Sequence, residues 1–173
     1  PEVELIIARS TADVVAKLDP AVCAEVDAVI NYSASLPVGA PPAAFPKARI
    51  AVRSGVGFDN IDTAGWGARN IPACNVPDYG TTEVADHAIA LMLSLTRGTI
   101  FYNDAVRADP VANWRQPAAR LVRRLRGQVF GVLGLGRIGL AAALRARGFG
   151  LEIAFFDPYL PSGMEIAVGA QRC

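Results

Sequence analysis

The sequence predicts an α/β protein built on parallel sheets and divided into two parts, and three observations support this fold class. Short apolar segments alternate with helical patterns over the first part of the chain. The same alternation returns over residues 129–157, around a glycine-rich turn. The chain has 173 residues, of which 52 % are hydrophobic and 19 % are charged, as expected for one or two well-cored domains. Strands that alternate with helices form parallel sheets, because each helix returns the chain to the end of the sheet at which the previous strand began.

The first part, residues 1–78, is expected to form one α/β domain. Its apolar segments are too short for helices and are bounded by polar or turn-forming residues. The expected strands are residues 3–8, 28–32, 50–53 and 73–76, and the expected short helices are residues 12–18 and 63–69. Residues 37–46 are rich in Pro and Ala, which predicts a loop or a short helix.

A long helix is expected over residues 82–108, followed by an irregular, arginine-rich connection up to residue 127. Its apolar residues repeat at helical spacing, and Glu83 suits the positive end of the helix dipole. Gly80 or Thr81 would cap the helix, Gly98 would bend it, and Asp109 before a proline would end it. Residues 79–127 are therefore predicted as the element between two domains and as a candidate dimer surface.

Residues 129–157 contain the most informative motif, a G-x-G-x-x-G turn between a strand and a helix. Gly134 would allow the tight turn, Gly136 would let a pyrophosphate approach the backbone, and Gly139 would let the helix pack closely. Asp157 ends a second apolar run roughly 20 residues further on, the spacing of an acid that accepts hydrogen bonds from an adenosine ribose. The motif predicts a dinucleotide site, although a glycine turn that only packs a helix on a sheet remains the alternative.

The first turn of the helix after the glycine motif supplies the expected phosphate contacts. Free backbone N–H groups and the helix dipole favour an anion there. The N–H groups of Arg137 and Ile138 are expected to meet the pyrophosphate, and the Arg137 side chain can reach a phosphate. The carboxylate of Asp157 would repel a 2′-phosphate, so the predicted cofactor is NAD rather than NADP.

Residues 128–173 are expected to form only the first part of a Rossmann-type, doubly wound nucleotide domain. Half of such a domain needs three parallel strands. Only residues 129–134 and 152–156 qualify here, with a helix expected over residues 162–168 and the third strand missing. A two-stranded sheet buries too little to be stable alone. We therefore expect this chain to be a piece of a larger protein.

Charge and cysteine usage exclude several classes of protein. The net charge is +1, which does not indicate a nucleic-acid or acidic membrane partner. Four arginines between residues 120 and 126 are interpreted as a solvated helix face. The three cysteines are far apart and lack metal-ligand spacing, so no metal site is predicted and reduced thiols are expected. With no signal peptide or membrane-spanning run visible, a cytoplasmic location is expected.

Three ordered motifs resemble one family. Residues 53–62 (RSGVGFDNID) resemble the R-x-G-x-G-x-D-N-I-D signature of the D-2-hydroxyacid dehydrogenases. Residues 75–86 resemble that family's entry to its long helix, and residues 134–139 match its nucleotide loop. Within the family, residues 74–77 and 156–160 look closest to the C-terminal binding protein branch and its bacterial relatives.

The resemblance implies a two-domain, NAD-dependent, homodimeric enzyme that interconverts a small D-2-hydroxy acid and a 2-keto acid. A flavodoxin-like substrate domain would precede the Rossmann-type domain, and both look incomplete in this chain. The turn at Gly55, Val56 and Gly57 can expose N–H groups to an anion, and the family uses this turn for the substrate carboxylate. Arg53 would line the same cleft, or else pair with Asp59 or Asp62.

The resemblance also implies which parts are missing. Val84 matches a position that borders the nicotinamide. The family's catalytic His, Glu and Arg would follow Cys173, so no catalytic residue is expected in this chain, and the chain alone is expected to be inactive. His87, the single histidine, lies outside the family's histidine motif. Two other functions stay open: an NAD-sensing dimeric interaction protein, like the co-repressors of that branch, and an inactive truncated homologue.

Overall fold

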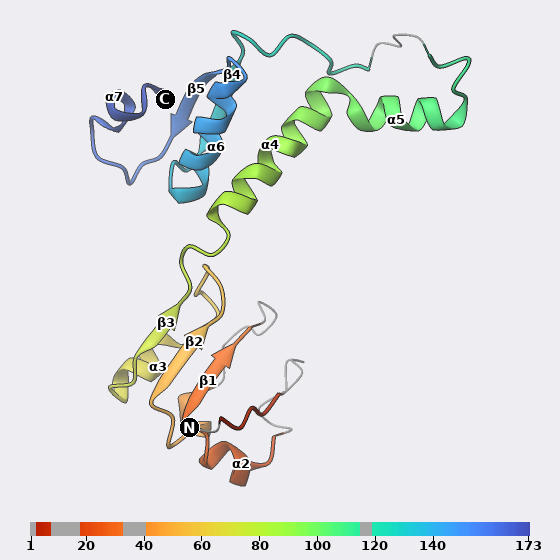
Figure 1. The fold of residues 1–173 in the computed structure, drawn as a ribbon. Helices are drawn as coiled ribbons and strands as arrows, with labels where there is room; N and C mark the ends of the chain where they lie inside the picture. Colours follow the sequence, from red (N-terminus) through yellow and green to blue (C-terminus); the bar gives the residue numbers. More distant parts are fainter. Residues whose placement is uncertain (1–2, 8–17, 33–40, 115–118) are drawn as a thin grey trace. The chain divides into compact units, whose positions relative to one another are not determined.

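The computed structural model describes residues 3–7, 18–32, 41–114 and 119–173. The chain divides into two units, Pro1–Tyr79 and Gly80–Cys173. Each unit contains its own three-stranded parallel sheet. Figure 1 traces the chain through both units. The prediction of an α/β protein with parallel sheets is confirmed.

The first unit is a parallel sheet in the order β1-β2-β3. Its elements are α2 (Pro20–Ala24), β1 (Ala28–Asn31), the 3-10 helix η1 (Pro42–Ala44), β2 (Ile50–Arg53), α3 (Thr63–Ala68) and β3 (Ala73–Asn75). The strand register pairs Asn31 with Arg53 and Arg53 with Asn75. These three polar residues therefore form one row at the carboxyl ends of the strands, the end at which parallel sheets bind ligands.

A small core under this sheet holds α3 in place. Trp66 of α3 is 2 % exposed and packs with four buried residues of the other elements, Cys23, Phe45, Ala48 and Ala51. The carboxylate of Asp62 caps α3 by accepting a hydrogen bond of 2.8 Å from the Gly65 N–H. Asp62, at the end of the 53–62 motif, thus has a structural role.

The strand expected over residues 3–8 is wrong for residues 3–7, the part that the structure describes. These residues have no strand pairing, and the side chains of Val3, Leu5 and Ile7 are 85 %, 72 % and 77 % exposed. Strand composition alone does not fix a pairing, and β1 pairs with β2 alone among the described strands, so residues 3–7 do not extend its sheet. The helix expected over residues 12–18 lies, except for Leu18, outside the described residues.

The second unit contains four helices and a parallel sheet in the order β4-β5-β6 among its described residues. Its elements are α4 (Thr81–Arg97), α5 (Thr99–Ala108), β4 (Val129–Leu133), α6 (Arg137–Gly148), β5 (Glu152–Phe156), α7 (Met164–Val168) and β6 (Gln171–Arg172). The buried residues of α4, α6 and the sheet form one core around Phe155, which is fully buried. The opposite face of the sheet is exposed at Val129, Leu133 and Phe156.

The long helix expected over residues 82–108 is two helices, α4 and α5, separated at Gly98. Gly98 has φ 65°, a left-handed conformation that ends α4. A Cβ at this position would lie 2.9 Å from side-chain atoms of Ala119 and Val122. A glycine is thus required both by the backbone angle and by the segment packed against it. The end at Asp109 is as predicted.

The second sheet has a third strand that the sequence did not reveal. β6 pairs with β5 in parallel register at residues 171–172, so the predicted two-stranded sheet is wrong. Arg172 secures this strand through an ion pair of 3.0 Å with Glu165 and a guanidinium 5.1 Å from the centre of the Phe155 ring. Its other nitrogens donate to the carbonyls of Asp157, Leu160 and Pro161. Two polar residues carry no strand pattern, which explains the error.

Acidification tests the anchoring of β6 through Glu165. Hydrogen bonds from the backbone N–H groups of Glu165 and Gly163, and then from Arg172, lower the pKa of Glu165 from its usual 4.5. Stability from these contacts is complete above the unfolded-state pKa and is lost as the pH falls through the lower folded-state pKa. We expect urea midpoints to fall less below pH 4.5 in Glu165→Gln than in the parent. Parallel pH curves for the two proteins would contradict this role.

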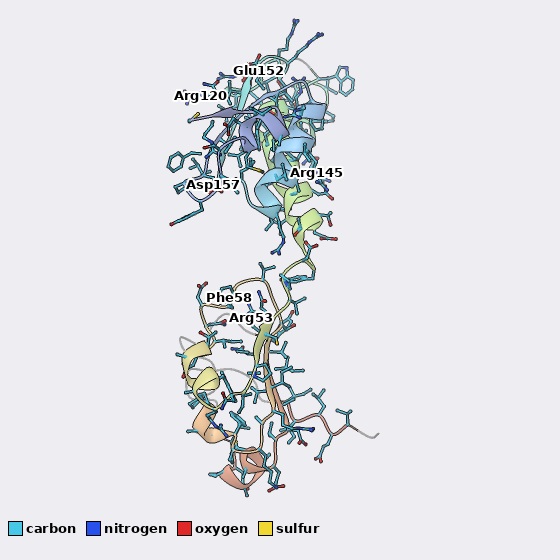
Figure 2. All side chains as sticks on the ribbon, turned by 90° about the vertical axis from the view of Figure 1, so that its left-hand side faces the viewer. Arg53, Phe58, Arg120, Arg145, Glu152 and Asp157 are labelled. Atoms are coloured by element: carbon cyan, nitrogen blue, oxygen red, sulfur yellow. The ribbon has the colours of Figure 1, made fainter. Side chains whose placement is uncertain are left out.

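The arginine-rich segment before β4 is not helical. Residues 119–127 form turns and irregular structure. The prediction that these arginines lie on a helix is therefore wrong. Arg120, Arg123, Arg124 and Arg126 are exposed, as Figure 2 shows for Arg120. Leu121 to Arg126 contain no i, i+4 pair of opposite charge, which is the usual support of an exposed helix.

The described residues offer neither a metal site nor a membrane-spanning helix. They contain no cluster of three or more His, Cys, Asp or Glu side chains that could hold a metal ion. None of their helices is both long enough and apolar enough to span a bilayer. All three cysteines are free thiols.

Candidate functional site

The glycine turn between β4 and α6 is held tightly by its own backbone. Gly134 has φ 86°, and its N–H donates a 2.9 Å hydrogen bond to the Phe156 carbonyl at the end of β5. A Cβ on Gly139 would overlap the Gly134 carbonyl oxygen and lie 3.1 Å from Val132 Cγ1. The side chain of Leu135 is buried in the core below the turn. The third glycine is therefore needed for the contact between α6 and the turn.

The outer side of the same turn is an open cradle. A Cβ on Gly134 or Gly136 would meet no heavy atom within 4 Å. Gly136 is the N-cap of α6 and makes no side-chain capping hydrogen bond, so the N–H groups of Arg137 and Ile138 are free of acceptors within the helix. Free N–H groups at an unobstructed helix N-terminus fit a pyrophosphate. The sequence-predicted roles of these residues remain predictions that this geometry allows.

Asp157 lies beside the cradle, directly after β5. Its Oδ2 accepts a 2.9 Å hydrogen bond from the Leu135 N–H inside the glycine turn, and its Oδ1 accepts one of 3.0 Å from the Tyr159 N–H. The residue is half-buried, and Figure 2 labels its position. The two hydrogen bonds fix the carboxylate and leave other lone pairs for hydroxyl donors, since each carboxylate oxygen can accept more than one bond.

Arg53, in the first unit, binds backbone carbonyls rather than a carboxylate. Its Nη1 donates to the carbonyls of Ser54 (2.6 Å) and Tyr32 (3.2 Å). Among the described residues it forms no ion pair, so the alternative of a salt bridge to Asp59 or Asp62 is wrong. Its guanidinium lies against the turn at Gly55, where a Cβ would overlap it. The first glycine of this turn makes room for the arginine. Figure 2 labels Arg53.

The turn itself offers two donors. The N–H groups of Val56 and Gly57 have no acceptor among the described residues, and both residues are exposed. Successive free N–H groups form an anion-binding nest. Beside this turn lies a hollow of about 200 Å³, lined by Phe58, Ile61, Thr63, Ala73, Cys74 and Asn75.

The helix α4 carries the remaining candidates. Val84, in its first turn, is 49 % exposed, which leaves it available to a ligand; its predicted place beside the nicotinamide stays a prediction. His87 is exposed on the same helix. Asp86 forms a 2.5 Å ion pair with Arg145, which joins α4 to α6.

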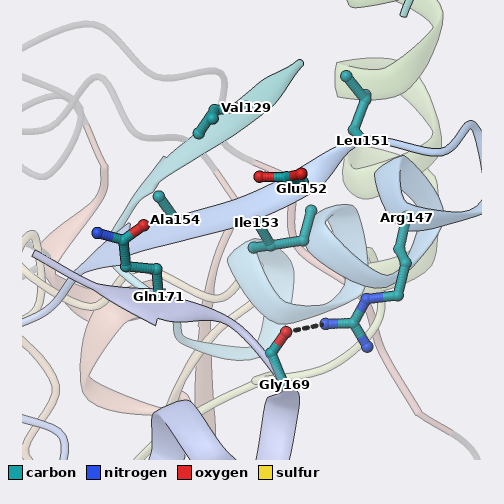
Figure 3. A pocket seen from close by; sticks show the side chains of 8 residues that line it. All are labelled: Val129, Arg147, Leu151, Glu152, Ile153, Ala154, Gly169 and Gln171. Carbon is teal, nitrogen blue, oxygen red and sulfur yellow. Dashed lines mark hydrogen bonds between the residues drawn. The ribbon is translucent and has the colours of Figure 1, made fainter. Parts of the chain in front are cut away.

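A larger pocket of about 390 Å³ opens at the other end of the second sheet. Its lining residues are Val129, Arg147, Leu151, Glu152, Ile153, Ala154, Gly169 and Gln171 (Figure 3). Most of them lie at the amino ends of the strands, whereas the glycine turn follows the carboxyl end of β4. Arg147 donates hydrogen bonds to the carbonyls of Val168 and Gly169. The pocket is thus separate from the cradle.

Comparison with known proteins agrees with this geometry. Residues 89–172 match the sequence model of the D-isomer specific 2-hydroxyacid dehydrogenase NAD binding domain. The chain is 36 % identical over 132 residues to C-terminal-binding protein 1 of Caenorhabditis elegans, covering 74 % of this chain and 18 % of that protein. It is 33 % identical over 147 residues to D-3-phosphoglycerate dehydrogenase of Mycobacterium leprae, covering 85 % and 27 %.

A solved structure shows the same fold. An NADPH-dependent glyoxylate/hydroxypyruvate reductase of Sinorhizobium meliloti superimposes with a TM-score of 0.74 at 34 % identity, covering 92 % of this chain and 48 % of that chain. The chain therefore spans less than half the length of each of these relatives.

A parallel sheet, a glycine turn that opens a helix and an acid at the next strand end define a dinucleotide-binding α/β protein. Residues 89–172 belong to the NAD binding domain of the D-2-hydroxyacid dehydrogenase family, and the chain as a whole is similar to proteins of that family. Both kinds of relative implied by its motifs, a C-terminal-binding protein and a metabolic dehydrogenase, are among its matches.

Proposed function

We propose that the protein carrying this sequence is an NAD-dependent oxidoreductase acting on a small D-2-hydroxy or 2-keto acid. The observation that carries the proposal is the carboxylate of Asp157, held 2.9 Å from the Leu135 N–H inside an open glycine turn. That arrangement provides an acceptor for a ribose and donors for a pyrophosphate side by side. Bound NAD would supply the hydride acceptor or donor.

The chain's own residues have distinct tasks in this proposal. The N–H groups of Arg137 and Ile138 bind the pyrophosphate, and Asp157 binds the adenosine ribose. The N–H groups of Val56 and Gly57 bind the substrate carboxylate, and Arg53 adds positive charge beside them. We do not assign the proton donor to His87, which lies exposed on α4, outside the family's histidine motif and with no nucleophile motif around it. The family relationship implies that a His–Glu pair and an Arg provide this step.

The second candidate function is an NAD-sensing interaction protein. The similarity to C-terminal-binding protein 1 favours it. We also propose that the protein is a homodimer, because α4 and α5 expose the apolar side chains of Leu91, Leu95, Ile100 and Phe101. A cytoplasmic location is consistent with its three free thiols.

Two measurements on the purified intact protein that carries this sequence distinguish the candidates. Dehydrogenase function predicts NADH oxidation with at least one of glyoxylate, hydroxypyruvate and pyruvate. A sensor predicts NADH-dependent dimerisation, seen by light scattering, without turnover of any of the three acids. An inactive homologue would show neither, and failure to bind NADH at all would contradict both candidates.

A further inference from the structure

The turn at residues 54–57 is held, one peptide plane at a time, by the strands on either side of it. The Ser54 carbonyl accepts from Arg53 Nη1 at 2.6 Å. The Gly55 carbonyl accepts from the Val76 N–H at 3.1 Å. The Val56 carbonyl accepts from Asn75 Nδ2 at 2.8 Å. The carbonyls of residues 54 to 56 thus each have a defined partner.

These hydrogen bonds determine where the free donors point. In a trans peptide the C=O and the following N–H lie in one plane and point in opposite directions, and the described chain has no cis peptide. Holding the Gly55 carbonyl towards β3 therefore directs the Val56 N–H away from β3. Holding the Val56 carbonyl in the same way directs the Gly57 N–H. These are the two donors of the anion nest.

We propose that Asn75 is a positioning residue for substrate binding, which orients the Gly57 N–H by holding the Val56 carbonyl. This inference rests on the proposed function of the turn. The Val56 N–H is oriented by backbone alone, through Val76, so no side-chain change can remove that restraint. The Gly57 N–H depends on one side chain. Asn75 stands next to Arg53 in the sheet register, at the strand end where the turn begins.

Asparagine is suited to this position because its amide is a neutral donor on a short side chain. An aspartate of the same shape would place a carboxylate oxygen against the Val56 carbonyl, and the two acceptors would repel each other. It would also put a negative charge beside a site for a carboxylate. Alanine would leave the carbonyl free to turn. We therefore expect Asn75→Asp to be more harmful than Asn75→Ala.

The first test reads the Gly57 N–H directly and needs no turnover. In protein labelled with ¹⁵N-glycine, the Gly57 signal is assigned by its loss in Gly57→Ala, and oxalate is titrated as a dianionic substrate mimic. We expect a saturable Gly57 shift in the parent and in the control Asn103→Ala, which alters an exposed asparagine on α5. In Asn75→Asp the oxalate affinity should fall about tenfold to a hundredfold, the usual cost of one hydrogen bond to a charged group. No Gly57 shift in the parent, or equal affinities in parent and Asn75→Asp, would overturn the proposal.

The second test separates this inference from the proposed function. With the keto acid that the parent reduces fastest, Asn75→Ala should raise KM about tenfold, with little change in kcat or in NADH affinity, as for a contact made equally in the ground and transition states. A reduced kcat with unchanged KM would overturn the positioning role. If the parent shows the oxalate shift but reduces none of the three acids, the dehydrogenase proposal fails while the role of Asn75 in anion binding stands.

Discussion

Replacing Gly139 by alanine is expected to weaken NADH binding more than tenfold and to lower the stability of the second unit by about 1–3 kcal/mol. The added Cβ would overlap the Gly134 carbonyl oxygen, a backbone atom that cannot rotate away. Either α6 or the glycine turn must shift. The turn is also tied to β5 through the Gly134 N–H, so a shift there would disturb the end of β5 as well.

A matched control lies in the same helix. Gly148 ends α6, and a Cβ there would meet no heavy atom within 4 Å. Gly148→Ala should leave NADH affinity unchanged and raise stability by about 0.5 kcal/mol, because alanine restricts the unfolded chain more than glycine does. NADH fluorescence titration and urea unfolding followed by circular dichroism measure both effects. Equal NADH affinities in Gly139→Ala and Gly148→Ala would show that the turn does not bind the cofactor.

The local sequence predicted the parts of the fold in which chain pattern and packing agree. β2 was expected at residues 50–53 and occurs there, because an apolar run ends at a polar residue before a glycine turn. The strands and helix around Gly134–Gly139 are likewise where the motif places them. In these segments the residues that pack the core are also those that define the element.

The errors have a common cause: each concerns a segment whose structure depends on contacts with residues that are distant in the sequence. The run at residues 3–7 has strand composition, but composition alone does not fix its pairing, and no described strand pairs with it. Gln171 and Arg172 have no strand composition, yet Glu165 and the Phe155 ring hold Arg172 in place beside β5. Gly98 interrupts a continuous apolar pattern because Ala119 and Val122, over 20 residues later, pack against it.

The candidate site shows the same limit at the level of side chains. The sequence identified Arg53 as a cleft residue but left open an ion pair with an aspartate, and only the structure shows its partners to be carbonyl oxygens. Asn75 was recognised only as part of a motif. Its role depends on a hydrogen bond to the carbonyl of Val56, which lies in the loop after β2. No local sequence pattern encodes a contact between residues so far apart. An asparagine directly before a proline-containing turn was the available signal.

The two glycine turns of this chain achieve a similar result by different means. At Gly134–Gly139, the absence of a side chain allows α6 to approach the backbone and leaves the outer side open. At Gly55–Gly57, side chains of neighbouring strands hold the carbonyls and so aim the N–H groups. The first turn should therefore be sensitive to added volume within it, and the second to changes in the residues around it.

Replacing Asp157 by asparagine is expected to weaken NADH binding by about 1–3 kcal/mol, or about fivefold to 150-fold. The carboxylate accepts from the Leu135 and Tyr159 N–H groups with different oxygens. An amide has only one oxygen, so one of these N–H groups would face an NH₂ group and lose its acceptor. The charged acceptor for the ribose is lost at the same time.

The same substitution should change the choice of cofactor, because a carboxylate at this position repels a 2′-phosphate. In the parent we expect NADH to bind more tightly than NADPH, and in Asp157→Asn the ratio of the two affinities should fall at least tenfold. The comparison is informative because one solved relative, at 34 % identity, is NADPH-dependent. Glu152→Gln, at the opposite end of β5, removes a similar charge away from the glycine turn and should alter neither affinity. If Asp157→Asn binds NADH as the parent does, Asp157 does not contact the ribose; if the parent prefers NADPH, the assignment of NAD is wrong.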